Sequence, residues 1–96
     1  MITLHIEHPV RDFAGWKAAF DSDPAGRERA GVRRYVISRP VDQPLYVMID
    51  LEFDDRGRAE KMLAVLENVW QTPRARGAVA GDVKTAIIEQ VEAHDL

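Results

Sequence analysis

The chain has 96 residues, of which 46% are hydrophobic and 30% charged, as in an ordinary globular domain rather than a disordered segment. The formal net charge of −3 argues against binding to nucleic acid or to an anionic membrane, because either would require a basic surface. The sequence contains no cysteine, which excludes disulfides, thiolate metal sites and a thiol nucleophile.

These properties predict a single domain over residues 1–96. The N-terminus has neither the basic start nor the long apolar run of a signal peptide, and no apolar run approaches the roughly 20 residues of a membrane helix. We therefore expect a cytoplasmic protein with no membrane contact.

The first half of the sequence predicts a strand, a helix and a second strand. Residues 2–8 alternate apolar and polar side chains, which is typical of a half-buried strand. Asp12 is suited to cap a helix over about residues 12–22, and residues 32–39 have the β-branched and aromatic character of a strand. One face of that helix carries apolar residues at helical spacing: Val10, Phe13, Trp16 and Phe20.

The second half predicts a strand, a helix and a final strand. Residues 45–53 alternate most clearly, and residues 83–92 form the last strand. Between them, Asp54 or Asp55 caps a helix over about residues 55–70. The apolar stripe of this helix consists of Ala59, Met62, Leu63, Leu66, Val69 and Trp70.

The resulting order, β-α-β-β-α-β, predicts an α+β, ferredoxin-like fold with two helices on one face of a four-stranded antiparallel sheet. The other face is left open. On that face we place His5, Tyr35, Ile37, Tyr46, Met48, Asp50, Ala86 and Ile88. Because this surface is too apolar for open water and too polar for a dry core, we expect a second copy to cover it, giving a homodimer whose paired sheets close into a barrel.

The same face supplies the candidate site. His5 is the candidate catalytic base, since a histidine near neutral pKa can take a proton from a phenol or an acidic C–H. The candidate ligand-binding residues are Tyr35, Tyr46, Met48 and Asp50. The alternative is that all five simply form the dimer interface. Trp16 and Trp70 leave a second location open, a pocket between the helices and the sheet, although core packing is their usual role.

No metal site is expected. A strand places His5 and Glu7 on one face and His8 on the other, whereas a zinc site needs three or four converging ligands. The arginines of "GRERAGVRR" and "PRARG" suggest an anion site, but such side chains more often stay solvated or pair with acids. RNA-recognition modules share the element order, yet "LYVMIDLEF" lacks their aromatic pattern, so no nucleic acid is expected.

Several segments carry a resemblance to a known family. They are "HPVRDFAGWKAAFD", the "AGV" before the second strand, "SRPVDQP" and "LENVW". Together with the element order, they resemble the dimeric α/β-barrel superfamily. Within it, the chain is most similar to small uncharacterised bacterial proteins related to the antibiotic-biosynthesis monooxygenases, some labelled cyclases. The group's pattern of His, Asp, Phe or Tyr, and Trp falls on His8, Asp12, Phe13 and Trp16.

This superfamily includes cofactor-free oxygenases acting on phenolic polyketides, haem-degrading enzymes and lactone isomerases. The haem-degrading branch uses an Asn on its first strand and a His on its second helix. Here the first strand has no Asn and the second helix has no His, so no haem and no other cofactor is expected. The resemblance implies a protein that binds a small aromatic or polyketide-like metabolite, as a cofactor-free monooxygenase or cyclase. The alternative is a non-catalytic homodimeric binding or structural protein.

Overall fold

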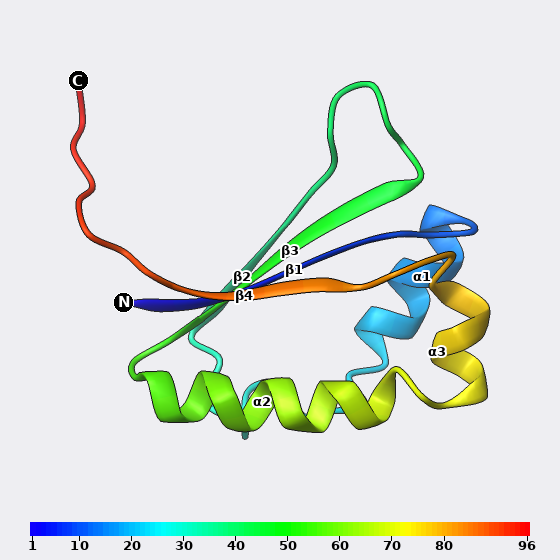
Figure 1. The fold of residues 1–96 in the computed structure, drawn as a ribbon, viewed down its shortest axis with the longest axis horizontal. Coiled ribbons are helices and arrows are strands. Elements are labelled where there is room, and N and C mark those ends of the chain that lie inside the picture. The colour runs from blue at the N-terminus through cyan, green and yellow to red at the C-terminus, as the bar shows by residue number, and fades with distance from the viewer.

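The computed structural model describes all 96 residues and contains four strands and three helices. In chain order these are β1 (Ile2–Pro9), α1 (Phe13–Asp21), β2 (Arg34–Ser38), β3 (Tyr46–Phe53), α2 (Arg56–Val69), α3 (Pro73–Ala78) and β4 (Lys84–Glu89). All three helices lie beneath one face of the sheet, and the other face is open (Figure 1). The ferredoxin-like α+β fold predicted from the sequence is therefore confirmed, and α3 is a short third helix between α2 and β4. None of the three helices has the length and apolar character that a membrane-spanning helix requires.

Each helix begins where a capping side chain satisfies free backbone N–H groups. The carboxylate of Asp12 accepts a hydrogen bond from the Gly15 amide at 2.7 Å, which confirms the predicted cap of α1. Asp55 caps α2, the second of the two residues considered for that role. In α3 the cap is Thr72, followed at once by Pro73, which suits the first turn because its missing N–H would have no helical partner there.

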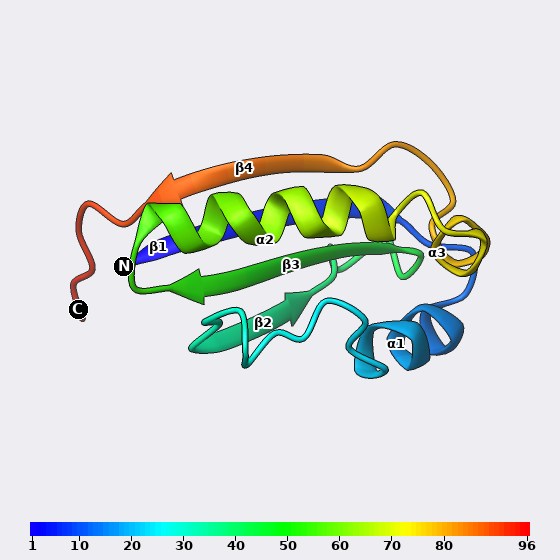
Figure 2. The same ribbon diagram turned by 90° about the horizontal axis from the view of Figure 1, so that it is seen from below.

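The sheet has the strand order β2-β3-β1-β4 and is antiparallel throughout (Figure 2). On β1, His5 lies opposite Asp50 of β3 and Ala86 of β4, so these three residues share a face. The neighbouring position, Leu4, lies opposite Leu51 and faces the helices. This register fixes which side chains meet across the sheet.

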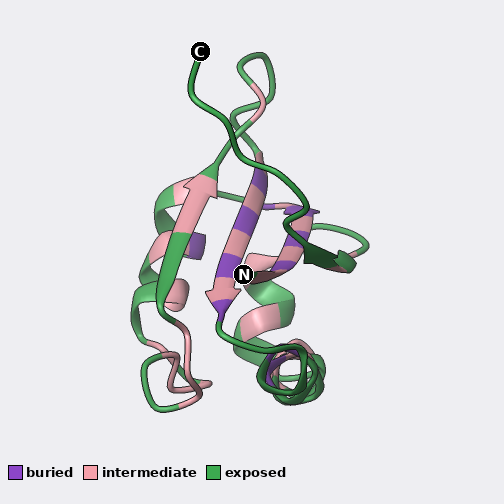
Figure 3. Ribbon diagram, turned by 90° about the vertical axis from the view of Figure 1, so that its left-hand side faces the viewer, coloured by how far each residue is buried: buried purple, intermediate pink, exposed green.

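The core lies between the sheet and the helices. Along β1 and β3 buried and partly exposed residues alternate, which Figure 3 shows as bands on these strands. The buried hydrophobic residues are Leu4, Ile6, Val10, Trp16, Val47, Ile49, Leu51, Phe53, Ala59 and Met62. Burial of such side chains stabilises the fold by roughly 1.5–3 kcal/mol each. His8 is the one polar residue buried among them.

The prediction for the faces of β2 was wrong. Tyr35 and Ile37 lie opposite Leu51 and Ile49, so both face the helices, and Val36 takes the open face instead. The apolar character of β2 is similar on its two sides, so alternation alone does not determine its orientation. Contacts with α1 and the following loop hold it: the ring of Tyr35 packs edge-on against Phe20 with centroids 5.1 Å apart.

Two segments extend to the open side of the sheet (Figure 1). One is the loop between β2 and β3, whose Val41 is fully exposed. The other is the chain after β4, which carries exposed Val91 and Leu96. Both flank the open face.

Candidate functional site

A cavity of about 180 Å³ lies between the sheet and the helices. Ile6, Ile49 and Leu51 contribute from the sheet, and Trp16, Met62 and Trp70 from the helices and their ends. The exposed residues of its lining, Ser22, Thr72 and Arg74 among them, form the mouth. The cavity is thus an apolar pocket that opens to solvent between α1 and α3.

His8 lines this cavity and is only 2% exposed. Its Nδ1 lies 2.9 Å from the carbonyl oxygen of Pro9, and because a carbonyl can only accept, Nδ1 carries the hydrogen. Nε2 then holds the lone pair and has no protein partner. Every fully buried polar side-chain atom in the structure has a hydrogen-bond partner. Nε2 has none, so it is not fully buried and opens on the cavity that His8 lines.

The pKa of His8 is lowered from its ordinary value. Burial is the main cause, because it disfavours the charged imidazolium, and the hydrogen bond to Pro9 opposes it only in part. His8 is therefore a neutral imidazole at pH 7, oriented by one ring nitrogen and basic at the other. This is the state that a general base requires.

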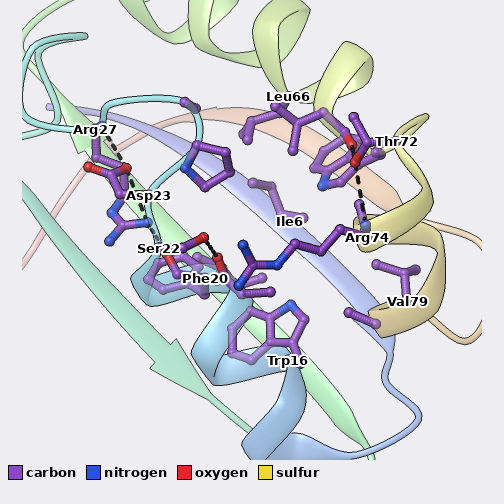
Figure 4. A pocket seen from close by; sticks show the side chains of 18 of the residues that line it. Ile6, Trp16, Phe20, Ser22, Asp23, Arg27, Leu66, Thr72, Arg74 and Val79 are labelled. Carbon is purple, nitrogen blue, oxygen red and sulfur yellow. Dashed lines mark hydrogen bonds and ion pairs between the residues drawn. The ribbon is translucent and has the colours of Figure 1, made fainter.

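Aromatic side chains of α1 form one wall. The ring of Trp16 packs edge-on against the ring of His8, with ring centroids 6.0 Å apart, and at a tilt against Phe20, with centroids 5.3 Å apart. Figure 4 shows Trp16 and Phe20 on one side of the cavity and Leu66 on the other. Such flat apolar walls suit a planar aromatic ligand.

Two arginines and one aspartate bring charge to the cavity. Arg27 donates from its backbone N–H to Asp23 at 2.9 Å, and its guanidinium lies 3.4 Å from the same carboxylate. The guanidinium also donates to the Phe20 carbonyl at 2.7 Å. Arg74 extends from α3 toward Ser22 and Phe20 (Figure 4) and forms no ion pair or hydrogen bond with the protein.

The predicted site residues lie on the other side of the sheet. His5 Nδ1 is 2.7 Å from the Asp50 carboxylate, and its Nε2 is 3.0 Å from the Glu7 carboxylate. The hydroxyl of Tyr46 donates to Glu7 at 3.1 Å. The sheet therefore brings together three of the five predicted residues, with Glu7 as an unpredicted fourth member of the network.

Burial acts to lower the pKa of His5, but its hydrogen bonds to Glu7 and Asp50 and the attraction of both carboxylates outweigh it, so the net pKa is raised. Donation from Tyr46 and His5 in turn lowers the pKa of Glu7, with His5 the larger cause. With both ring nitrogens facing carboxylates, His5 suits an imidazolium that donates twice. Its predicted role as a base stays a prediction.

None of the five predicted residues lines the cavity. Met48 lies on the open face beside Tyr46 and Asp50, and Tyr35 faces the helices.

The sequence reasoning missed two residues of the cavity, His8 and Arg74. The alternation of β1 already placed His8 on the face of Leu4 and Ile6, and a histidine in such an apolar stripe is the available indication of a special role. No group of three or more potential metal ligands is present.

No protein-family model matches the chain, and no curated protein matches it. Solved structures do. SnoaB, a cofactor-independent oxygenase from Streptomyces nogalater, superposes with a TM-score of 0.74 at 14% identity, over 96% of this chain and 94% of that one. A dimeric ferredoxin-like protein from an uncultured marine organism gives a TM-score of 0.64 at 14% identity, over 97% of both chains.

An antibiotic biosynthesis monooxygenase gives a TM-score of 0.58 at 11% identity, over 96% of this chain and 100% of that one. The three structures share the ferredoxin-like fold with this chain, which confirms the predicted fold. They also match the kinds of protein that the sequence resembles. At these identities, the shared property is the fold.

Proposed function

We propose that this protein binds a small aromatic metabolite in the cavity between the sheet and the helices and acts on it as a cofactor-free monooxygenase or cyclase. The observation that carries the proposal is the geometry of His8: its Nδ1 donates to the Pro9 carbonyl, and its Nε2 opens on a cavity lined mainly by apolar side chains. The shared fold of SnoaB, described as a cofactor-independent oxygenase, supports it.

The chemistry begins with proton abstraction. His8 Nε2 accepts a proton from a phenol or an acidic C–H of the bound ligand, and the Nδ1–H···O bond to Pro9 holds the ring in the required tautomer. The resulting anion is electron-rich enough to reduce dioxygen. When the hydroperoxide formed at a CH₂ carbon loses water, a carbonyl remains, so one oxygen atom enters the product and the other leaves as water.

The apolar walls contribute by excluding water. Trp16, Phe20 and Met62 surround the position where the anion forms, and a dry site increases the effect of a nearby dipole. A cyclase would use the same first step, after which the carbanion forms a C–C bond with an internal carbonyl carbon and the carbonyl oxygen takes up the proton. Both reactions therefore depend on His8.

The test pairs binding with turnover. A panel of phenolic compounds is screened by thermal shift, and the compounds that bind are followed by oxygen consumption and mass spectrometry of the products. His8→Gln is expected to keep ligand binding and to lose at least about 10²-fold in rate, the lower range of a general base. His5→Gln, on the opposite face, is the matched control and is expected to retain activity.

Ligand binding without oxygen uptake or a cyclised product would support the alternative, a non-catalytic binding protein. Loss of turnover in His5→Gln with full activity in His8→Gln would return the base to His5, the residue favoured by the sequence. Absence of binding across the whole panel would contradict the proposed function itself.

We also propose that the protein is a homodimer through the open face of the sheet. This face carries Val36, Met48, Ala86 and Ile88, and Ile88 is 44% exposed. The β2–β3 loop and the chain after β4 extend beyond it on the open side of the sheet, where they could contact a second copy. Dimeric ferredoxin-like proteins of the same fold support the assignment.

The dimer is tested by sedimentation velocity at micromolar concentration. Met48→Glu places a charge in the middle of the face and is expected to give a monomer. Lys61→Glu, on the exposed side of α2, is the control and should leave the dimer intact. A wild-type monomer at these concentrations would contradict the assignment.

A further inference from the structure

We propose that the cavity selects an aromatic ligand of one or two rings that carries an anionic group, a carboxylate above all, which Arg74 binds at the mouth. This inference rests on the proposed function, because it specifies the ligand of the same cavity. It draws on three observations: the charge balance of the lining, the cavity volume and the separation of Arg74 from His8.

The charge balance leaves one cation without a partner. Asp23 and Arg27 neutralise each other, and Arg27 is held further by the carbonyl of Phe20 and by its stacking 4.0 Å above the Phe20 ring. His8 is neutral. Arg74 alone reaches the cavity with a free guanidinium, so the lining as a whole attracts an anion.

Half of the ten arginines of the chain pair with a carboxylate, whereas Arg74 does not. Arg33, Arg34, Arg56 and Arg58 each pair with a carboxylate on the surface. No aspartate or glutamate other than Asp23 lines the cavity. A guanidinium presents parallel N–H groups that match the two oxygens of a carboxylate, so a carboxylate is the anion that fits it best.

The volume limits the ring system. A cavity of about 180 Å³ is only slightly larger than an engineered cavity of about 150 Å³ that holds benzene, and smaller than the roughly 300–1,000 Å³ of sites for drug-sized ligands. One ring fits, and a second fused ring extends toward the mouth. Ligands of three or more fused rings would require the helices to move apart.

The positions of the two polar groups orient the ligand. His8 is buried on the sheet, whereas Arg74 is exposed on α3. A ligand with its carboxylate at Arg74 therefore directs its opposite end toward His8. The hydroxyl or acidic C–H that reacts should lie at the end of the ring system away from the carboxylate, as in 6-hydroxy-2-naphthoate.

The experiment measures binding by calorimetry with matched ligands on the wild type. 6-Hydroxy-2-naphthoate is compared with its uncharged carboxamide and with a three-ring analogue that keeps both groups, 6-hydroxyanthracene-2-carboxylate. We expect the carboxylate to bind at least about tenfold more tightly than the carboxamide, and the difference to shrink as salt is raised. The three-ring acid is expected to bind more weakly than the two-ring acid.

Variants then assign the charge. Arg74→Gln is expected to remove the preference for the carboxylate while leaving carboxamide binding unchanged. Arg76→Gln is the control: it removes the same charge from the same helix, but Arg76 donates to Gln71 and does not line the cavity. Equal effects of the two substitutions would show a general electrostatic attraction and overturn the role of Arg74.

The outcomes separate this inference from the proposed function. If the carboxamide binds as tightly as the carboxylate, the anion preference is wrong and the aromatic site remains. If the three-ring acid binds more tightly than the two-ring acid, the size limit is wrong. If no ligand binds in any charge state or size, both this inference and the proposed function fail.

Discussion

His5 and His8 are three residues apart on β1, and the alternation of the strand places them on opposite faces. His5 lies between two carboxylates on the open face, whereas His8 lies in an apolar environment beneath the sheet. One strand therefore holds two histidines whose pKa values are shifted in opposite directions. The difference arises from the partners of each ring, not from the residue type.

We predict that the pKa of His5 lies above the ordinary value of 6.5 and that the pKa of His8 lies below it. His5 should lose its proton above that pH, because Glu7 and Asp50 stabilise the charged ring more than burial destabilises it. His8 should stay neutral until the pH falls below it, because burial disfavours the charged ring. Two-dimensional NMR of the ring C–H groups, assigned with the variants His5→Gln and His8→Gln, measures both. A reversed order would contradict the assigned environments.

At this scale, the sequence determines position better than role. Alternation along residues 2–8 correctly separated His5 and Glu7 from His8. It did not reveal which histidine has a free nitrogen, because that depends on Asp50, which is 45 residues away, and on the backbone carbonyl of Pro9. Hydrogen bonds to another strand or to a backbone carbonyl lie beyond what spacing alone predicts.

Among the elements, α1 is short, and its first turn depends on one side chain. Asp12 accepts from the Gly15 amide and so satisfies an N–H that has no partner within the helix. Asp12→Ala is expected to lower the free energy of unfolding by about 1 kcal/mol, and Asp12→Asn to retain most of it. Urea denaturation of the three proteins measures the differences. An unchanged Asp12→Ala stability would mean that packing of Trp16 alone holds the helix.

The loop before β2 contains a second position at which one residue type is required, Gly31. Gly31 has a φ of 97°, and a Cβ added there would lie 2.8 Å from the Cδ atom of Arg58 on α2. Gly31→Ala should therefore be destabilising by about 1–3 kcal/mol through backbone strain. Gly77→Ala in α3 is the control, since nothing lies within 4 Å of its added Cβ. Its stability should be equal to or slightly above that of the wild type.

The elements themselves were predictable where one face is clearly apolar. The strand at Tyr46–Phe53 and the cap at Asp12 follow from local pattern alone. The orientation of β2 did not, because Tyr35, Val36 and Ile37 give neither face a polar character. The contact of Tyr35 with Phe20 decides it, and that contact exists only once α1 has docked.

For the molecule as a whole, the sheet separates two surfaces of different character. Beneath it, the helices enclose the cavity that carries the proposed activity, and above it lies the face proposed to bind a second copy. The sequence predicted the open face but only allowed for a pocket near Trp16 and Trp70. A cavity depends on the distance between α1, α2 and α3, which no pattern within a single element encodes.

The open face contains a charge network that a second copy would cover. His5 bonds both Glu7 and Asp50. Glu7 also accepts from Tyr46 and lies opposite Lys84 of β4. At the edge of the sheet, Arg34 of β2 pairs with Glu52. In the proposed dimer, His5 supplies the positive charge between the two carboxylates nearest to it. If it loses its proton, those carboxylates stay in the interface with less compensation.

Dimer stability should therefore depend on pH with a definite sign. Dimerisation depends on pH through the difference in the His5 pKa between monomer and dimer. In the monomer Glu7 and Asp50 already raise that pKa, and we expect their enclosure in the interface to favour the charged ring further, so that the contribution of His5 to the dimer is lost as the pH rises through its raised pKa. We expect the dissociation constant to be larger at about pH 9 than at about pH 6, measured by sedimentation at several protein concentrations. His5→Gln should remove this dependence, since His5 is the only histidine of the network. A dissociation constant that changes equally with pH in both proteins would mean that the His5 network lies outside the interface, and so that the sheets do not pair through this face.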